Sequence, residues 1–390
     1  MTPSWLPAHT QSLVDFALRS VAPEGGFGWL DDDGVITRAQ PRLLWINGRM
    51  THVLALAERR LGRTDCAPAV DHGLEALAHL FHDAEHGGWF NALDWDGRVT
   101  TPGKGAYAHA FVILASASAL AAGHALALPI LRDALDISTR YFWDGTHQMI
   151  VDDWDTAFTN LDDYRGVNSN MHTVEAYLAA AEALEANGDA ATATTLRQRA
   201  LAICDRVVNQ ATRANGWRMP EHFDANWHPN LDYNRDTPAD QFRPYGATIG
   251  HGFEWARLCL QVQAAVPDHP AWLADGALAL FDQSQADGWD VDGAPGFVYT
   301  IDWDGTPVVH ERMHWVICEA IGAAVAIQKA GLRDTGSQED AWWAFADKYF
   351  IDHERGSWHH ELDRANQPSS TVWQGKPDIY HAIQAALASL

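Results

Sequence analysis

The sequence of 390 residues is poor in positive charge. It contains 27 lysines and arginines against 51 aspartates and glutamates, which gives a formal net charge of −24 at pH 7. A strongly acidic chain is repelled by phosphate backbones and by anionic lipid surfaces. We therefore expect no nucleic-acid partner and no membrane partner.

Long apolar runs and targeting signals are also missing. No apolar stretch reaches the roughly 20 residues that a transmembrane helix needs. The N-terminal segment MTPSWLPAHTQSLVDF shows neither the basic region nor the apolar region of a secretory signal peptide. The few cysteines are far apart and match no disulfide framework and no metal-ligand spacing. They are Cys66, Cys204, Cys259 and Cys318. These absences predict a reduced, cytoplasmic location.

The motifs of several enzyme classes are absent as well. The chain has no GxSxG nucleophile motif, no Walker-type motif and no dinucleotide-binding glycine motif. None of the cysteines lies in an evidently activating context. No linker or low-complexity segment divides the chain, so we expect one catalytic domain over residues 1–390.

Tryptophan is abundant, with 18 copies, and many of them flank glycine and aspartate in turn-like segments. Sugar-binding proteins commonly use such rings to cover the apolar face of a pyranose. Large aromatic side chains can equally fill the ends of a helical array. The composition leaves both interpretations open.

A block that combines glycine, tryptophan and acidic residues recurs six times, about 60–70 residues apart. The blocks are Glu24–Gly34, Glu85–Gly97, Phe142–Asp155, Ala214–Trp227, Ala286–Gly305 and His353–Gln367. Their short apolar alternation predicts small β-hairpins. The regular spacing indicates a repeat architecture whose period is too long for the common two-helix solenoid repeats.

Helical patterns occupy the segments between these blocks, with apolar residues three and four positions apart. We predict helices near 7–22, 43–61, 67–82, 106–122, 126–142, 170–187, 190–211, 247–265, 270–284, 312–330, 338–349 and 378–390. This makes two helices per repeat. Six helical hairpins without a boundary predict an all-α fold, an (α/α)6 barrel in which the hairpins close a toroid with short β-hairpin and loop insertions.

Polar residues, often histidine, cluster at the start of the first helix after each block. Such groups inside a helical bundle are costly unless they serve each other or a ligand. The clearest case is YGATIGHGFEWARL, where Glu254 follows His251 by three positions and so shares its helix face. A histidine near a helix N-terminus beside a carboxylate suits a general base, although a satisfied buried histidine is an open alternative.

A metal centre is the main competing interpretation of these histidines. His172 and Glu175 form HxxE, as do His251 and Glu254. However, HExxH is absent, the two HxxE pairs lie in different repeats, and Glu319 is the one obvious additional glutamate. We therefore do not expect a catalytic metal.

Four segments together resemble the N-acylglucosamine 2-epimerase superfamily. They are WINGRMTH near the N-terminus, NSNMHTVEAYL, IGHGFEWARL, and KPDIYHAIQA near the C-terminus. The resemblance spans nearly the whole chain. It is strongest to the aldose–ketose isomerase branch, which includes mannose isomerase and sulfoquinovose isomerase-like proteins. It implies an (α/α)6 barrel and chemistry without metal or cofactor.

The resemblance also implies residue roles. His251 and His381 match the two catalytic histidines of the family. The positions implied to contact substrate are Arg49, Asn168, His172 and Glu254, and, more loosely, Trp45, His109, Trp315 and Trp373. The implied substrate is a monosaccharide, and the sequence leaves monomer or homo-oligomer open.

The implied reaction interconverts D-mannose, or a close aldose such as D-lyxose, and D-fructose or the matching ketose. The reaction would go through a cis-enediol(ate), with proton transfers made by His251 and His381. Glu254 would orient His251, and Arg49 and His172 would stabilise the oxyanion. A sugar 2-epimerase shares the first proton abstraction. A sulfonated sugar would need a cationic clamp, for which Lys104, Arg243 and Lys376 are available.

Two further classes stay open from the residues alone. An (α/α)6 glycoside hydrolase would need two carboxylates across the scissile bond, either Asp302 with Asp304 or Glu254 with Glu319. That assignment leaves the histidine pair without a role. A non-catalytic sugar-binding protein would explain the tryptophans but not the histidines at several helix starts.

Overall fold

The computed structural model describes residues 2–390, and helices dominate it. In chain order they are α1 (Leu6–Leu18), α2 (Leu44–Leu61), α3 (Ala67–His79), α4 (Ala106–Ala122), α5 (Ala127–Ile137), α6 (Val167–Ala186), α7 (Ala190–Cys204), α8 (Ile249–Ala265), α9 (Trp272–Gly288), α10 (His314–Lys329), α11 (Gly336–Phe345) and α12 (Tyr380–Ser389). Each of the twelve predicted helices is therefore confirmed, with ends that shift by a few residues. None of those in residues 2–390 has the length and apolar character needed to cross a bilayer.

Short irregular turns extend several of these helices. A 3₁₀ turn, η1 (Thr64–Cys66), precedes α3. Single π-helical stretches continue α5, α7 and α11, which is why the sequence pattern suggests longer helices there. These stretches are η2 (Ser138–Phe142), η3 (Asp205–Thr212) and η4 (Ala346–Phe350).

The strands are two or three residues long and lie in the turn blocks or between a block and the helix that follows it. They are β1 (Arg42–Leu43), β2 (Ala92–Leu93), β3 (Val99–Thr101), β4 (Lys104–Gly105), β5 (Trp143–Asp144), β6 (Met149–Ile150), β7 (Asp153–Trp154), β8 (Arg165–Gly166), β9 (His222–Phe223), β10 (Ala247–Thr248), β11 (Thr300–Ile301), β12 (Pro307–Val309), β13 (Arg312–Met313) and β14 (Glu361–Leu362). The predicted hairpins appear as the antiparallel pairs β2–β3, β5–β6 and β11–β12 and as isolated bridges.

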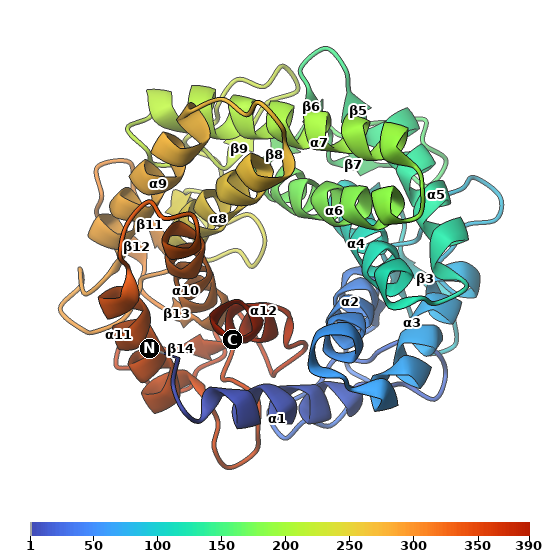
Figure 1. The fold of residues 1–390 in the computed structure, drawn as a ribbon, viewed down its shortest axis with the longest axis horizontal. Helices are drawn as coiled ribbons and strands as arrows, with labels where there is room; N and C mark the ends of the chain where they lie inside the picture. Colours follow the sequence, from blue (N-terminus) through green and yellow to red (C-terminus); the bar gives the residue numbers. More distant parts are fainter. Residues whose placement is uncertain (1) are drawn as a thin grey trace. The chain divides into compact units, whose positions relative to one another are not determined.

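The contacts divide the chain into two compact units. The N-terminal unit comprises Val14–Ile203 with Ala225–Trp227, and the C-terminal unit comprises Cys204–Asp224 and His228–Leu390 with the first residues up to Leu13. In the N-terminal unit α2 packs against α4, and α4 packs against α6 (Figure 1). In the C-terminal unit α8 and α12 both pack against α10 (Figure 1).

We call α2, α4, α6, α8, α10 and α12 the central helices. Within each unit, a second helix packs against most of them. Helix α3 packs on α2 and α5 packs on α4, while α9 packs on α8 and α11 packs on α10. In α5 the buried residues Ile130, Leu131, Ala134 and Leu135 form one apolar stripe, as expected of an outer helix. Helix α4 is instead buried on nearly all sides, which its alanine-rich sequence permits.

The starts of the central helices are fixed by strands rather than by capping side chains. The two residues before a central helix pair antiparallel with the next turn block: β1 with β2, β4 with β7, β10 with β11, and β13 with β14. The first helical N–H then donates to a carbonyl of that block, as from Leu44 to Asn91 (2.9 Å) and from Ile249 to Tyr299 (3.1 Å). This repeated device holds the helix starts, where the candidate site residues lie.

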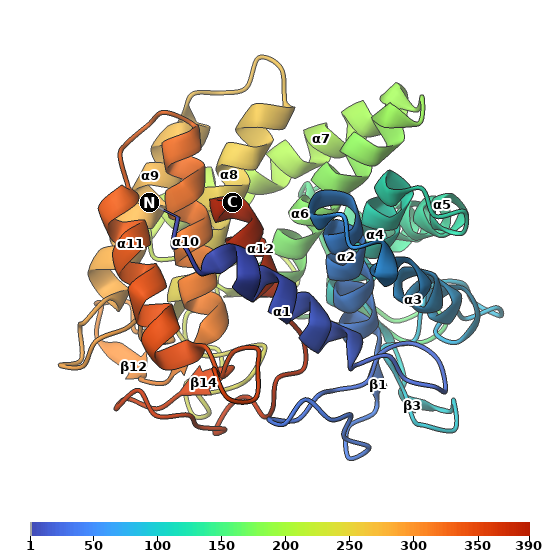
Figure 2. The same cartoon turned by 60° about the horizontal axis from the view of Figure 1, so that its bottom comes forward.

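The strands of each unit gather at one end of its helices. Figure 2 shows β12 and β14 at one end of α10 and α11, and, in the N-terminal unit, β1 and β3 at one end of α2 and α3. The acidic residues of the blocks build the turns at these ends. An Asp Oδ1 accepts the N–H of the residue four positions later in five blocks, at Asp31, Asp94, Asp155, Asp224 and Asp363.

Candidate active site

His251 lies in the first turn of α8 and is buried. Its Nδ1 lies 2.9 Å from Oε2 of Glu221, so the imidazole donates a proton to that carboxylate. Glu221 is itself held in place, because its Oε1 accepts the backbone N–H of Thr248 (3.3 Å). A carboxylate at Nδ1 fixes the tautomer of a neutral imidazole and places the lone pair on Nε2. His251 is thus prepared to accept a proton through Nε2.

His381 lies in the first turn of α12 with the same arrangement. Its Nδ1 is 2.9 Å from Oε1 of Glu319, a buried residue of α10. The two histidines therefore come from different helices but share one device, a buried carboxylate behind Nδ1. This device supplies what general acid–base chemistry needs, a ring of fixed orientation whose other nitrogen can exchange a proton.

Trp315 of α10 contacts both imidazoles. Its ring centroid lies 5.2 Å from that of His251 and 5.7 Å from that of His381, with interplanar angles of 38° and 37°. Gly250 allows this approach, because a Cβ at that position would lie 2.2 Å from Cζ3 of Trp315. The two histidines and the indole thus form one cluster within the C-terminal unit.

Glu254 does not orient His251 in this structure, contrary to the sequence-based interpretation of the HxxE pair. The carboxylate at His251 Nδ1 belongs to Glu221, while Glu254 lies beside a guanidinium, with Oε1 3.5 Å from Nη2 of Arg257. The helical spacing placed Glu254 on the correct helix. It could not reveal that a residue 30 positions earlier reaches the same ring.

Glu254, Glu319 and His381 lie close enough together to share a cation. The side chain of Arg257 already lies beside these two carboxylates. Its Nε is 2.9 Å from Oε2 of Glu319, and its Nη2 faces Glu254. The guanidinium supplies the positive charge that a metal ion would otherwise bring to the two carboxylates. The donor set therefore fits an ion-paired cluster better than a resident metal.

Trp373, in the loop before α12, is buried at the edge of the same unit. Its backbone N–H donates to Oε2 of Glu361 (2.8 Å), and its ring meets Phe242 edge to face at 5.7 Å. Glu361 also accepts bonds from Ser369 and Thr371, which fixes the whole loop. The burial of Glu361 would raise the pKa of its carboxyl, but these hydrogen bonds outweigh it and lower that pKa.

The N-terminal unit holds a second cluster, on α2 and α4. The Arg49 guanidinium lies 5.0 Å from the ring of Trp45 and 4.7 Å from that of Phe111, and its Nη2 donates to the hydroxyl of Tyr107 (3.0 Å). Two aromatic faces and one hydroxyl hold this cation in a fixed direction. The planar guanidinium remains suited to binding the oxygen atoms of a ligand.

His172 on α6 joins this cluster. Its ring lies edge to face with Tyr107 at 5.3 Å and 4.8 Å from Phe111, and its Nδ1 is 3.7 Å from Oε2 of Glu175. Asn168, one turn earlier on the same helix, is half-buried. Trp45, Arg49, Asn168 and His172 thus occur in one unit, whereas Glu254, Trp315 and Trp373 of the predicted set occur in the C-terminal unit.

His109 has a structural role that the sequence did not reveal. It is buried, its Nε2 accepts the backbone N–H of Trp89 (3.0 Å), and its Nδ1 donates to the carbonyl of Gly105 (2.8 Å). Burial lowers the pKa of His109 to about 4. One ring nitrogen binds the backbone of the second turn block and the other binds that of β4, so the prediction that His109 contacts substrate is corrected.

The cations that precede several central helices are also structural. Lys104 Nζ pairs with Asp83 (2.7 Å) and donates to the carbonyl of Gly87, while Lys376 Nζ pairs with Asp352 (2.6 Å). Both lysine side chains are fully buried. Lys104 and Lys376 are therefore not available as a clamp for a sulfonate.

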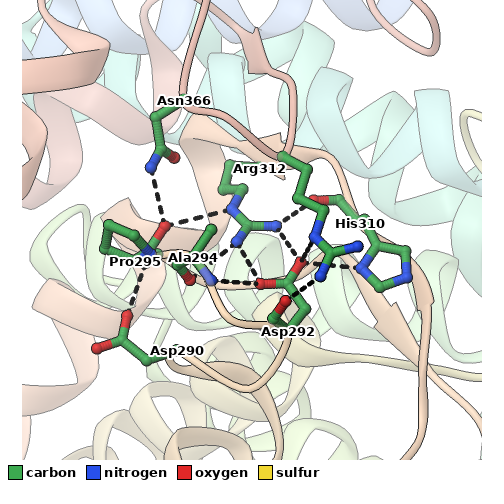
Figure 3. A network of polar contacts seen from close by, with 9 residues as sticks. Asp290, Asp292, Ala294, Pro295, His310, Arg312 and Asn366 are labelled. Carbon is green, nitrogen blue, oxygen red and sulfur yellow. Dashed lines mark hydrogen bonds and ion pairs between the residues drawn. The ribbon is translucent and has the colours of Figure 1, made fainter.

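Arg312 shows the same device at the fifth block (Figure 3). Its Nη1 and Nη2 bind the two oxygens of Asp292 at 2.8 and 2.7 Å, and Nη2 also donates to the carbonyl of Ala294 (3.1 Å). Asp292 further accepts a bond from Nδ1 of His310 (2.8 Å). The burial of Asp292 would raise its pKa, but these partners outweigh it and hold the pKa well below its usual value.

Turn formation also accounts for the tryptophans of the blocks. The indole N–H groups donate to backbone carbonyls of neighbouring segments, as from Trp89 to Leu77 (2.8 Å) and from Trp154 to Tyr141 (2.9 Å). Trp95 and Trp303 do the same. For these four rings the packing interpretation is confirmed. Trp45 and Trp315 differ from these rings, because Trp45 lies beside Arg49 and Trp315 lies beside His251 and His381.

The carboxylates considered for glycoside hydrolysis are engaged elsewhere. Asp302 Oδ1 accepts the hydroxyl of Tyr245 (2.9 Å) and the N–H of Trp303, and Asp304 accepts the N–H of Thr306. Burial raises the pKa of the Cys66 thiol to about 11, so that group does not supply a thiolate nucleophile at neutral pH. The clustered histidines remain the best candidates for chemistry.

Comparison with known proteins identifies the family of the chain. Residues 25–385 match the family model of N-acylglucosamine 2-epimerase. The chain is 47% identical over 384 residues to a D-mannose isomerase of Thermobifida fusca, covering 98% of this chain and 92% of that protein. It is 44% identical over 392 residues to a D-mannose isomerase of Pseudomonas cannabina pv. alisalensis, covering 98% and 91%.

A solved structure of a D-mannose isomerase superposes with a TM-score of 0.91 at 28% identity, covering 99% of this chain and 97% of that one. The chain therefore belongs to the N-acylglucosamine 2-epimerase family. Its fold is of the (α/α)6 class, as the helix pattern predicted. It is a sugar isomerase or epimerase enzyme.

The sequence interpretation missed the contacts of three residues of the C-terminal unit. Glu221 lies in the fourth turn block, where acidic residues are common, so no sequence feature assigned it a separate role. Arg257 follows Glu254 by three positions, a spacing that predicts an ion pair but not the contact of Arg257 with the carboxylate at His381. Glu319 was weighed as a metal ligand or a glycosidase acid. Its contact with His381 depends on the packing of α10 against α12.

Proposed function

We propose that this chain is a D-mannose isomerase that interconverts D-mannose and D-fructose, with D-lyxose as a further candidate aldose. The observation that carries the proposal is the pair of histidines, each with a buried glutamate at Nδ1, in one cluster with Trp315. The 44–47% identity to two D-mannose isomerases over nearly the whole chain supports the choice of sugar.

The proposed reaction uses the open-chain aldose. One imidazole takes the proton from C2, the C2–H electrons form the C1–C2 double bond, and O1 receives a proton, which gives a cis-enediol. The proton then returns to C1, O2 loses its proton, and the ketose results. His251 and His381 share these transfers through Nε2, the nitrogen opposite the glutamate. The balance requires no oxidant, reductant or metal.

The substrate-binding roles remain part of the proposal. Arg49, held between Trp45 and Phe111, is proposed to bind sugar oxygens, together with His172 and Asn168. We also propose a single catalytic domain over residues 1–390. A sulfonated sugar is disfavoured, because Lys104 and Lys376 are buried in ion pairs with Asp83 and Asp352.

The test compares the turnover of D-mannose by the wild-type protein and by two single variants, His251→Ala and His381→Ala. Losing a positioned acid–base group is expected to lower kcat by about 10²–10⁴. His228→Ala is the matched control, because His228 lies in the same unit with its side chain 76% exposed. If either catalytic-site variant kept wild-type turnover, the two-histidine mechanism would be wrong. If the wild type made glucose in place of fructose, the protein would be a 2-epimerase.

A further inference from the structure

Arg257 is a buried cation that the proposed reaction has not yet used. It lies on α8, its side chain is 9% exposed, and it faces two acids that are more deeply buried, Glu254 (1%) and Glu319 (3%). A buried guanidinium is costly unless its environment compensates its charge. Here two carboxylates compensate the charge of Arg257: that of Glu319, which contacts His381, and that of Glu254.

The contacts form an ordered chain across three helices. His381 on α12 donates from Nδ1 to Oε1 of Glu319 (2.9 Å), and Glu319 on α10 receives Nε of Arg257 at its other oxygen (2.9 Å). Arg257 also faces Glu254, one turn earlier on α8, with 3.5 Å between Nη2 and Oε1. Each oxygen of Glu319 thus has its own partner, and the carboxylate cannot rotate without breaking one of the two bonds.

The backbone of α10 leaves room for this arrangement. Gly322 follows Glu319 by three positions on the same helix and faces Arg257. A Cβ at Gly322 would lie 3.2 Å from Cδ of Arg257, closer than ordinary van der Waals contact. The small residue therefore allows the arginine stem to run along α10 and reach Glu319.

We propose that Arg257 is a positioning residue that keeps Glu319 ionised and fixed, so that His381 presents its Nε2 lone pair to the substrate. This inference rests on the proposed isomerase function. Without the guanidinium, two buried carboxylates would be left close together, and such pairs relieve their repulsion by taking up a proton. A protonated Glu319 can donate to Nδ1 of His381, which moves the ring proton to Nε2 and removes the base.

The two histidines depend on different carboxylates. Glu221 holds His251 through its own bonds to Nδ1 and to the backbone N–H of Thr248. Arg257 contacts Glu319, the carboxylate that binds His381, whereas the carboxylate that binds His251 is Glu221. Loss of Arg257 should therefore impair the transfers made by His381 and leave the orientation of His251 intact.

The test measures kcat and KM for D-mannose in Arg257→Gln, Arg257→Lys and the matched control Arg218→Gln. Arg218 also forms a two-bond ion pair in this unit, with Asp287 at 2.8 and 3.0 Å. We expect Arg257→Gln to lose at least about tenfold in kcat, a part of the roughly 10²–10⁴ that a positioned acid–base group supplies, with KM changed less than about twofold. Arg257→Lys, which keeps the charge, should recover much of the loss, and Arg218→Gln should match the wild type.

A substrate deuterated at C2 gives a second readout. If proton transfer becomes slower in Arg257→Gln, the isotope effect on kcat should rise above that of the wild type. Should this variant not fold, Gly322→Ala replaces it, because the added methyl displaces the arginine stem without removing a charge. Wild-type kcat and isotope effect in the folded Arg257 variant would overturn the inference while leaving the isomerase function in place. An inert wild type would instead reject the function itself.

Discussion

The replacement Gly250→Ala tests how strictly Trp315 is placed between the two histidines. The added Cβ would lie 2.2 Å from Cζ3, 2.6 Å from Cη2 and 2.8 Å from Cε3 of the indole, whereas ordinary contact begins at 3.4 Å. The ring must therefore recede by about 1.2 Å at Cζ3, or α8 must move away from α10. Because the indole packs on His251 and His381, either movement should disturb the two histidines that we propose to be catalytic.

The expected magnitudes follow from two opposing effects. Overpacking of a well-packed interior costs about 1–3 kcal/mol. Replacing a helical glycine by alanine stabilises the folded protein by about 0.5–1 kcal/mol through helix propensity, which offsets part of this cost. We expect Gly250→Ala to lower the free energy of unfolding by about 0–2.5 kcal/mol. A displacement of about 1 Å near the reacting groups can cost roughly 10²-fold in rate, so kcat should fall more than stability suggests.

The assay is a double-mutant cycle with Trp315→Phe, read by chemical denaturation and by mannose turnover. The shorter ring lacks the atoms that clash, so Gly250→Ala should cost little in that background, with a coupling energy of about 1–3 kcal/mol. Gly276→Ala on α9 is the control, because its Cβ meets only Val208 at 3.2 Å within close range. An equal loss of stability in both backgrounds would refute the steric argument.

Three further outcomes follow from the structure. Glu221→Gln should lower kcat by at least about tenfold, because His251 loses the carboxylate at Nδ1, and a pre-steady-state measurement of proton abstraction should show it. Lys376→Met should cost about 3–5 kcal/mol in denaturant unfolding, because Asp352 stays buried without its cation; wild-type stability would contradict this. Burial would raise the pKa of Asp352, but bonds from Lys376 and from the N–H groups of Arg355 and Glu354 outweigh it and lower that pKa from 3.8 to about 2. Its contribution to wild-type stability is therefore complete above about pH 4 and lost between pH 4 and 2, and an acid titration of unfolding should show a weaker loss in Lys376→Met.

The fold was predictable because its determinants are local and repeated. Three- and four-residue apolar spacing marks every helix, and the glycine- and aspartate-rich blocks mark the turns between them. The aspartates at Asp94 and Asp363 accept the N–H four residues later, a local interaction that sequence spacing encodes directly. The π-helical extensions after α5, α7 and α11 were not predictable, because their apolar spacing continues that of the helix.

Sequence motifs identify the candidate histidines, but the carboxylates that contact them depend on packing. His251 and His381 follow from their motifs. The partner of His251 is 30 positions away, and that of His381 is 62 positions away. No helical periodicity reports contacts at such separations. His109 shows the converse error, since a histidine at a helix start resembled a ligand-binding group while both of its nitrogens bind backbone.

The central claim is that this chain isomerises a free aldose by proton transfer through an enediol. The most direct test incubates the purified, EDTA-treated protein with D-mannose in D₂O and follows the sugar by proton NMR. The account predicts that D-fructose appears, that deuterium enters at the carbon that receives the proton, and that EDTA does not slow the reaction. Mannose that stays unchanged and undeuterated, or glucose as the dominant early product, would contradict it.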